Sequence, residues 1–173
     1  MCVKTTFPFS FSLESTQIYV HKDVVAAFQL ARQKKNENER FGVIIGSKDK
    51  DKDKDKDKDK DKDKECYWIE HLTKPCPGDK SSFTSFTLED PAHQSIVDQK
   101  FKESQGHLAY LGTWHTHPEP FPEPSTVDRR DWKKCLARND DRQIFFCIVG
   151  TREFRFFKMH GGKFKRMKMT HHI

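Results

Sequence analysis

The sequence lacks the features that mark secreted, membrane-spanning or disulfide-stabilised proteins. Its five cysteines are an odd number without a C-x-x-C pair, and no apolar run approaches the roughly 20 residues of a transmembrane helix. The N-terminal residues contain no apolar core of a signal peptide. We therefore expect a cytoplasmic protein with free thiols, of which Cys135 and Cys147 belong to the core. No motif supports a catalytic cysteine.

One segment distorts the charge content. Charged residues make up 34% of the 173 residues, but residues 48–65 alone hold nine Lys, eight Asp and one Glu, whose charges cancel. Without this segment, about 26% of the chain is charged, which is ordinary for a globular domain. The alternating Lys/Asp run buries nothing as a helix or a strand, so we interpret it as a solvated loop between two strands. The length predicts a single domain over residues 1–173.

The net charge of +6 lies entirely in the C-terminal part. Residues 151–173 contain seven basic side chains and one acid, so the rest of the chain sums to zero. A basic end of this kind could meet nucleic acid or an acidic protein surface. A solvated terminal strand and tail explains the same pattern, and we favour that interpretation over nucleic-acid binding.

Alternating and periodic patterns predict an α/β (α+β) chain, with a mixed β-sheet and helices packed on it. Strands are expected over residues 7–12, 17–20, 41–45, 66–72, 108–117, 143–150 and 151–159, and residues 163–173 fit a last strand or a tail. The first strand, which contains Pro8, is expected at an edge of the sheet. Asp23 and Asp90 are expected to cap the first two helices, whose buried faces should include Leu30 and Phe101.

One stretch carries the residues that point to chemistry. His115 and His117 follow a short apolar run that predicts a buried strand, in which residues two apart point to the same face. Pro118 should end that strand, and Ser125 is a good N-cap for the following helix. Asp128, three residues on, returns a carboxylate to the two imidazoles. Two His and one Asp are a plausible three-ligand zinc set that leaves a fourth position for water.

The motif H-x-H-x(7)-S-x-x-D, formed by His115, His117, Ser125 and Asp128, resembles the signature of the JAMM (JAB/MPN+) metalloproteases. The resemblance covers roughly residues 17–159 and implies the three-layer, cytidine-deaminase-like fold of that family. It implies one Zn²⁺ per chain, bound by the two histidines and the aspartate. It also implies hydrolysis of peptide or isopeptide bonds at the C-terminus of ubiquitin-like modifiers.

The same resemblance implies a catalytic glutamate at the start of an early strand. Glu39 falls in that place, just before Phe41-Gly42, where family members often show two glycines. Because this difference loosens the register, Glu37 is the alternative. By resemblance, Glu39 acts as general base and then general acid, and Ser125 binds the water or helps to hold the oxyanion. A solvated Glu39 and a purely capping Ser125 are the structural alternatives.

Within the family, the Pro-rich loop after His117 resembles the prokaryotic JAB branch, especially the deconjugating isopeptidases of CBASS anti-phage operons. This implies a protein conjugate as partner, with a ubiquitin-like C-terminal tail. The tail could be that of a nucleotidyltransferase, such as a cyclic-oligonucleotide synthase, joined to its target by an E1/E2-like protein. A JAB-type peptidase acting on a phage-tail or small peptide, and a non-enzymatic MPN scaffold, stay open as alternatives. No membrane partner is expected.

Overall fold

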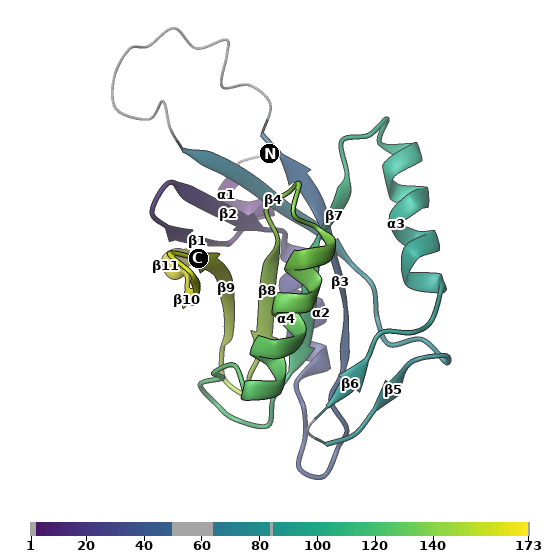
Figure 1. Ribbon diagram of the computed structural model, residues 1–173. Coiled ribbons are helices and arrows are strands. Elements are labelled where there is room, and N and C mark those ends of the chain that lie inside the picture. Colours follow the sequence, from purple (N-terminus) through teal and green to yellow (C-terminus); the bar gives the residue numbers. More distant parts are fainter. Residues whose placement is uncertain (1–2, 50–63, 84, 173) are drawn as a thin grey trace, which may run out of the picture.

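A nine-stranded mixed sheet organises the part of the chain that the computed structural model describes, residues 3–49, 64–83 and 85–172 (Figure 1). The strand order is β10-β9-β8-β7-β3-β4-β2-β1-β11, and β5 and β6 form a separate small hairpin. In chain order the elements are α1 (Val3–Thr6), β1 (Phe9–Leu13), β2 (Thr16–Val20), α2 (Lys22–Ala31), β3 (Phe41–Lys48), β4 (Glu65–Leu72), β5 (Lys80–Ser81), β6 (Phe86–Thr87), α3 (Ala92–Glu103), β7 (Ala109–Thr116), α4 (Thr126–Arg138), β8 (Phe145–Val149), β9 (Phe154–His160), β10 (Lys163–Arg166) and β11 (Lys168–His172). The predicted fold class is confirmed. Of the predicted Lys/Asp loop, residues 48–65, the stretch 50–63 lies outside the described residues, whereas Lys48 ends β3 and Glu65 begins β4.

The histidine strand β7 lies in the middle of the sheet, antiparallel to β3 and parallel to β8. Phe41, the first residue of β3, pairs with His115 near the end of β7, so the segment before β3 runs beside the two histidines. The β3–β7 register shifts next to Gly112, which has a φ of +143°. A Cβ atom there would lie 1.7 Å from the carbonyl oxygen of Phe145, so only glycine fits this position.

The residues of β8 face two cores, which explains why this strand is apolar throughout. Phe145, Cys147 and Val149 pack with α2, while Phe146 and Ile148 pack with α4. In the view of Figure 1, α4 lies in front of β8 and α2 lies behind the sheet. The chain therefore forms three layers. Both cysteines predicted for the core are buried there.

The sheet coils back on itself because its two edge strands, β10 and β11, are consecutive in the chain and separated only by Met167. The backbone N–H of Met167 donates to the carbonyl oxygen of Phe156 on β9 at 2.8 Å, and its side chain is buried. Phe154 on β9 packs against Phe9 and Phe11 of β1, with ring centroids 5.0 and 5.7 Å apart. The basic C-terminal residues thus form strands. The prediction of β1 as an edge strand is wrong, because β11 pairs with it.

Two details of α2 differ from the sequence-based expectation. Its N-cap is His21 rather than Asp23, because the His21 Nδ1 atom accepts a hydrogen bond from the Asp23 backbone N–H at 3.1 Å. Leu30, expected to be buried, is 80% exposed. The buried face of the helix is instead formed by Val24, Val25, Phe28 and Ala31.

The start of α3 also differs. Its N-cap is Pro91 rather than Asp90, although the Asp90 carboxylate accepts a hydrogen bond from the backbone N–H of Ala92 at 2.9 Å. Phe101, expected on the buried face, is 50% exposed, whereas Val97 is buried. None of the described helices is long and apolar enough to cross a membrane.

Candidate metal centre

The three predicted metal ligands converge where β7 ends and α4 begins. The Nε2 atoms of His115 and His117 lie 3.1 Å apart. Asp128 spans both imidazoles, with Oδ1 3.2 Å from His115 Nε2 and Oδ2 3.2 Å from His117 Nε2. All three side chains are buried. The site is therefore a compact triangle of two nitrogen atoms and one carboxylate.

Hydrogen bonding alone accounts poorly for this triangle. Two Nε2 atoms that face each other need one imidazole to donate and the other to accept, although both already face the same carboxylate. Among the described residues, the Nδ1 atoms of His115 and His117 are buried without a hydrogen-bond partner. Ligand atoms of a tetrahedral zinc lie about 3.3 Å apart, which is close to the spacing observed. The donor set therefore fits a zinc ion.

The two histidines are held by the strands on either side of them. The backbone N–H of Thr116 donates to the carbonyl oxygen of Arg40, and the Thr116 hydroxyl accepts from the Arg40 N–H, both at 2.9 Å. On the other side, the backbone N–H of His117 donates to the carbonyl oxygen of Val149 at 3.0 Å. His117 lies just beyond β7, but these contacts keep its side chain beside that of His115.

The N-terminal turn of α4 fixes the aspartate. Ser125 is the N-cap, as predicted, and its hydroxyl accepts from the Asp128 N–H at 3.0 Å. The Asp128 Oδ2 atom accepts in return from the Ser125 N–H at 2.8 Å. This reciprocal capping box limits the rotamers of Asp128, so the carboxylate is oriented before any ligand arrives.

Glu39 lies beside the triangle, whereas Glu37 does not. Glu39 is 4% exposed, and its Oε1 atom lies 3.9 Å from His117 Nε2. Glu37 instead accepts a hydrogen bond from the backbone N–H of Lys34 at 3.0 Å and pairs with Arg40. Of the two glutamates considered, only Glu39 therefore has a position suited to the chemistry of the site.

Burial and charge set the protonation of the site. Burial raises the pKa of Glu39 to about 7, with His117 opposing and Asp128 adding to the shift. Burial lowers the pKa of His115. For Asp128, burial acts to raise the pKa, but hydrogen bonds from His115 and His117 outweigh it and lower the value. An ionised aspartate and a neutral imidazole are the forms that bind a metal.

Negative charge gathers around His117. Burial acts to lower its pKa, but Asp128, Glu39 and Glu119 outweigh burial and raise it. Glu119 lies on the Pro-rich loop, with Oε2 3.9 Å from His117 Nδ1. Because these carboxylates favour a positive charge here, the electrostatics agree with a bound cation.

Aromatic rings enclose the other imidazole. Phe86 from β6 stacks on Phe41 at 4.7 Å between ring centroids and lies 5.0 Å from the His115 ring. Trp132 of α4 lies 6.3 Å from His115 on another side. Phe86 and Glu119 lie beside the site although no prediction from the sequence includes them. Glu119 stands inside the motif, which was the available signal, whereas Phe86 reaches the site only through the tertiary fold.

A second cluster, of Cys76, Asp79 and His93, also has ligand-type atoms within 4.8 Å of one another. Ordinary hydrogen bonds account for it. Asp79 Oδ2 lies 2.6 Å from His93 Nε2 and accepts from the Cys76 N–H, while Oδ1 accepts two further backbone N–H groups. The other His93 nitrogen lies 2.6 Å from the Thr73 hydroxyl. We therefore interpret this cluster, the Asp79 hydrogen-bond cluster, as a structural feature, unlike the His-His-Asp triangle.

Comparison with solved structures supports the fold. The solution structure of protein DSY2949 from Desulfitobacterium hafniense superposes with a TM-score of 0.53 over 87% of this chain and 90% of that protein. The two sequences are 17% identical, so this similarity concerns the fold alone.

Three curated relatives carry the name CD-NTase/cGAS isopeptidase. The protein from Escherichia coli (strain TW11681) is 32% identical over 100 residues, which is 58% of this chain and 63% of the relative. The protein from Pseudomonas aeruginosa (strain BWHPSA011 / Pa011) is 41% identical over 83 residues, or 47% and 52%. The protein from Vibrio cholerae serotype O1 (strain ATCC 39315 / El Tor Inaba N16961) is 36% identical over 83 residues, or 48% and 52%. The chain thus spans between half and two thirds of each relative.

The family assignment rests on a longer match. The family model described as prokaryotic homologs of the JAB domain matches residues 21–160, which include all the elements from α2 to β9 and the whole His-His-Asp triangle. This chain belongs to the family of prokaryotic homologs of the JAB domain.

Proposed function

We propose that this protein is a zinc-dependent isopeptidase that releases the C-terminus of a conjugated protein from the lysine of its target. The observation that carries the proposal is the convergence of His115, His117 and Asp128 on one point, with the buried carboxyl group of Glu39 beside it. The name shared by the three relatives supports the reaction class.

In this mechanism the two histidines and the aspartate hold the metal. A zinc ion supplies a Lewis acid that makes water nucleophilic at neutral pH. Glu39 accepts a proton from the attacking water and passes it to the lysine amine as the C–N bond breaks. A pKa of about 7 lets this carboxyl group act in both directions near neutral pH, a step typically worth ~10²–10⁴-fold in rate.

Ser125 has two roles in the proposal. Its hydroxyl oxygen accepts from the Asp128 N–H, and a hydroxyl that accepts at its oxygen keeps a proton that it can donate. The residue is exposed, unlike the ligands, so a substrate can reach it. We infer that this proton is donated to the developing oxyanion.

The proposed substrate is a conjugate whose attached protein is a CD-NTase, that is, a cyclic-oligonucleotide synthase of a CBASS system. The names of the three relatives support this choice over a phage-tail or small peptide. A non-enzymatic scaffold is disfavoured because ligand set and glutamate are present together.

The test compares wild type with Glu39→Gln and His115→Ala on an isopeptide-linked conjugate. Wild type should carry about one zinc per chain and cleave the conjugate. Glu39→Gln should keep the zinc but lose roughly 10²–10⁴-fold in turnover, and His115→Ala should lose both. Glu37→Gln, the same change two residues away, is the matched control and should behave as wild type.

Two treatments complete the test. A chelator should abolish cleavage, and alkylation of the thiols should leave it unchanged. Retained cleavage in Glu39→Gln, or cleavage of linear peptides only, would contradict the proposal.

A further inference from the structure

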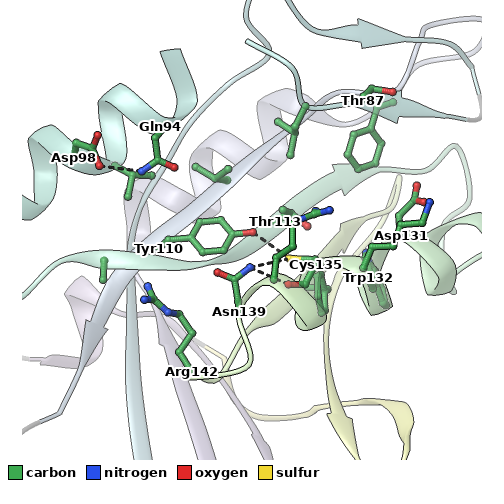
Figure 2. A pocket seen from close by; sticks show the side chains of 18 of the residues that line it. Thr87, Gln94, Asp98, Tyr110, Thr113, Asp131, Trp132, Cys135, Asn139 and Arg142 are labelled. Carbon is green, nitrogen blue, oxygen red and sulfur yellow. Dashed lines mark hydrogen bonds between the residues drawn. The ribbon is translucent and has the colours of Figure 1, made fainter. Parts of the chain in front are cut away.

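A groove with a volume of about 1060 Å³ lies between α3 and α4, over the face of the sheet that carries His115 (Figure 2). Tyr110 and Thr113 of β7 form its floor, with Asp98 of α3 on one side and Cys135 of α4 on the other. The Tyr110 hydroxyl lies 3.3 Å from the Cys135 sulfur. The groove is thus bounded by two helices and a strand of the central sheet.

One end of this groove reaches the metal centre. Phe86 and Trp132 both line the groove, and both pack against the His115 ring. Thr113 lies two positions before His115 on β7, so their side chains share a face. A chain lying in the groove would therefore arrive at the His-His-Asp triangle.

The α4 wall of the groove carries a row of positive charges. Arg130, Lys134 and Arg138 are spaced four residues apart, so they lie on one side of the helix, and Arg142 follows just beyond its end. All four side chains are exposed. Arg130 is paired with Asp131 at 3.3 Å. Within the described ranges, no carboxylate lies within ion-pair distance of Lys134 or Arg138, so both charges are available to a ligand.

We propose that this groove binds the C-terminal tail of the conjugated protein in an extended form, and that Lys134 and Arg138 select tails with acidic residues near the scissile bond. The inference rests on the proposed isopeptidase function. In an isopeptide bond, the tail is a free extended segment, whereas the lysine projects from a folded target. Only the tail therefore has a shape that fits a narrow groove.

The helix geometry sets the expected positions of the acidic residues. Lys134 and Arg138 lie six and ten residues after Asp128, or about 9 and 15 Å along the helix axis at 1.5 Å per residue. An extended chain advances about 3.3 Å per residue. The two cations therefore face the third and the fifth residue before the bond, approximately.

An acidic peptide suits the groove better than a nucleic acid does. Asp98 and Asp131 also line the walls, and they would repel a strand that carries a phosphate at every residue. A peptide, by contrast, can have acidic residues at the positions opposite Lys134 and Arg138 and uncharged residues elsewhere. Partly exposed apolar side chains that line the groove, such as Phe86 and Phe101, suit the remaining side chains of such a peptide.

The test uses three short fluorescent peptides, each joined through its C-terminus to the ε-amine of a lysine reporter. They carry Glu, Gln or Lys at the third and fifth positions before the bond and are otherwise identical. The enzymes are wild type, the double variant Lys134→Glu with Arg138→Glu, and Lys133→Glu as a control on the same helix outside the groove. Zinc content and thermal unfolding establish that each variant is folded.

An exposed ion pair changes an equilibrium by roughly 1.5- to fivefold, so two pairs should give wild type about a twofold to 25-fold preference in kcat/KM for the Glu tail over the Gln tail. Added salt should reduce this preference. The double variant should lose it and prefer the Lys tail, while Lys133→Glu should match wild type. Faster cleavage of the Lys-tail peptide than of the Glu-tail peptide by the double variant is a result that destabilisation of the protein alone would not produce.

Three outcomes would overturn the inference. If wild type cleaves all three peptides equally, the isopeptidase function stands but the groove does not select acidic tails. If wild type cleaves none of them, the proposed function fails and the inference fails with it. Single-stranded oligothymidylate could instead displace the Glu-tail peptide from the Glu39→Gln enzyme. If it does, and if the double variant no longer binds the oligonucleotide, the row of cations binds nucleic acid instead.

Discussion

Replacing Asp79 by Asn should lower the free energy of unfolding by roughly 2 kcal/mol at neutral pH. The Asp79 side chain is only 2% exposed and accepts hydrogen bonds from His93 and from the backbone N–H groups of Cys76, Glu89 and Asp90. Burial acts to raise its pKa, but these hydrogen bonds outweigh burial and lower it from 3.8 to about 2. At 1.36 kcal/mol per pKa unit, this difference corresponds to roughly 2 kcal/mol of stability.

The sign of the pH dependence follows from the lowered pKa. The folded state holds the carboxylate ionised, so its contribution is complete above the unfolded pKa near 3.8 and is lost as the pH falls through about 2. Urea unfolding of wild type and Asp79→Asn should therefore differ most at pH 7 and converge in strong acid. Asp140→Asn, an exposed change of the same kind, should leave stability nearly unchanged. Equal stability of wild type and Asp79→Asn at pH 7 would refute the reasoning.

The same unfolding experiment tests whether the Asp79 hydrogen-bond cluster is held by hydrogen bonds alone or is a second metal site. In a His115→Ala background, which removes the first site, a chelator should not change stability if Asp79 and His93 are held by hydrogen bonds alone. Cys76→Ser should likewise be close to neutral, because the cluster uses the Cys76 backbone N–H. A chelator effect as large as that of Asp79→Asn would show that a metal holds the cluster together.

Three other changes test the support of the site and the tolerance of the chain. Arg155→Ala should weaken zinc binding in a competitive titration by less than the roughly tenfold typical of groups that hydrogen-bond a ligand directly, because this side chain supports the site only by tying the Pro-rich loop to β9 through Glu123; Arg152→Ala is its control. Gly112→Ala should destabilise the fold by more than ~2 kcal/mol in chemical unfolding, because its Cβ would meet the Phe145 carbonyl oxygen. Replacing residues 50–63 with a short Gly/Ser linker should leave kcat/KM within about twofold, because loop length costs little stability.

The His-His-Asp triangle could be predicted because short-range rules fix most of it. Two histidines separated by one residue at a strand end point to the same face. Ser125, three residues before Asp128, caps a helix almost independently of its surroundings. The position of Glu39 is less local. It followed from the family resemblance, and it agrees with the pairing of Phe41 with His115.

The errors concern contacts between residues that are distant in sequence. Leu30 and Phe101 are apolar residues on helices, but whether they are buried depends on which neighbours cover them. Residues 163–173 fitted either a last strand or a tail because their own pattern is weak, so β1 was expected at an edge, yet β11 pairs with it. Period and propensity describe one segment at a time, so they cannot identify such a partner.

The hydrogen bonds around Asp79 also affect the candidate metal centre, because the segment between β4 and α3 contacts both. The Thr73 hydroxyl contacts His93 and accepts a hydrogen bond from the Val43 N–H on β3, so the Asp79 hydrogen-bond cluster is connected to the sheet. Further along the segment, the Ser82 carbonyl oxygen accepts the Glu39 N–H at 2.8 Å, and Phe86 packs on His115. A segment anchored at both ends can hold Glu39 and His115 in place without belonging to the His-His-Asp triangle itself. Under the proposed function, loss of the Asp79 hydrogen-bond cluster should therefore slow turnover more than it weakens zinc binding, since the three proposed ligands have their own supports on β7 and α4.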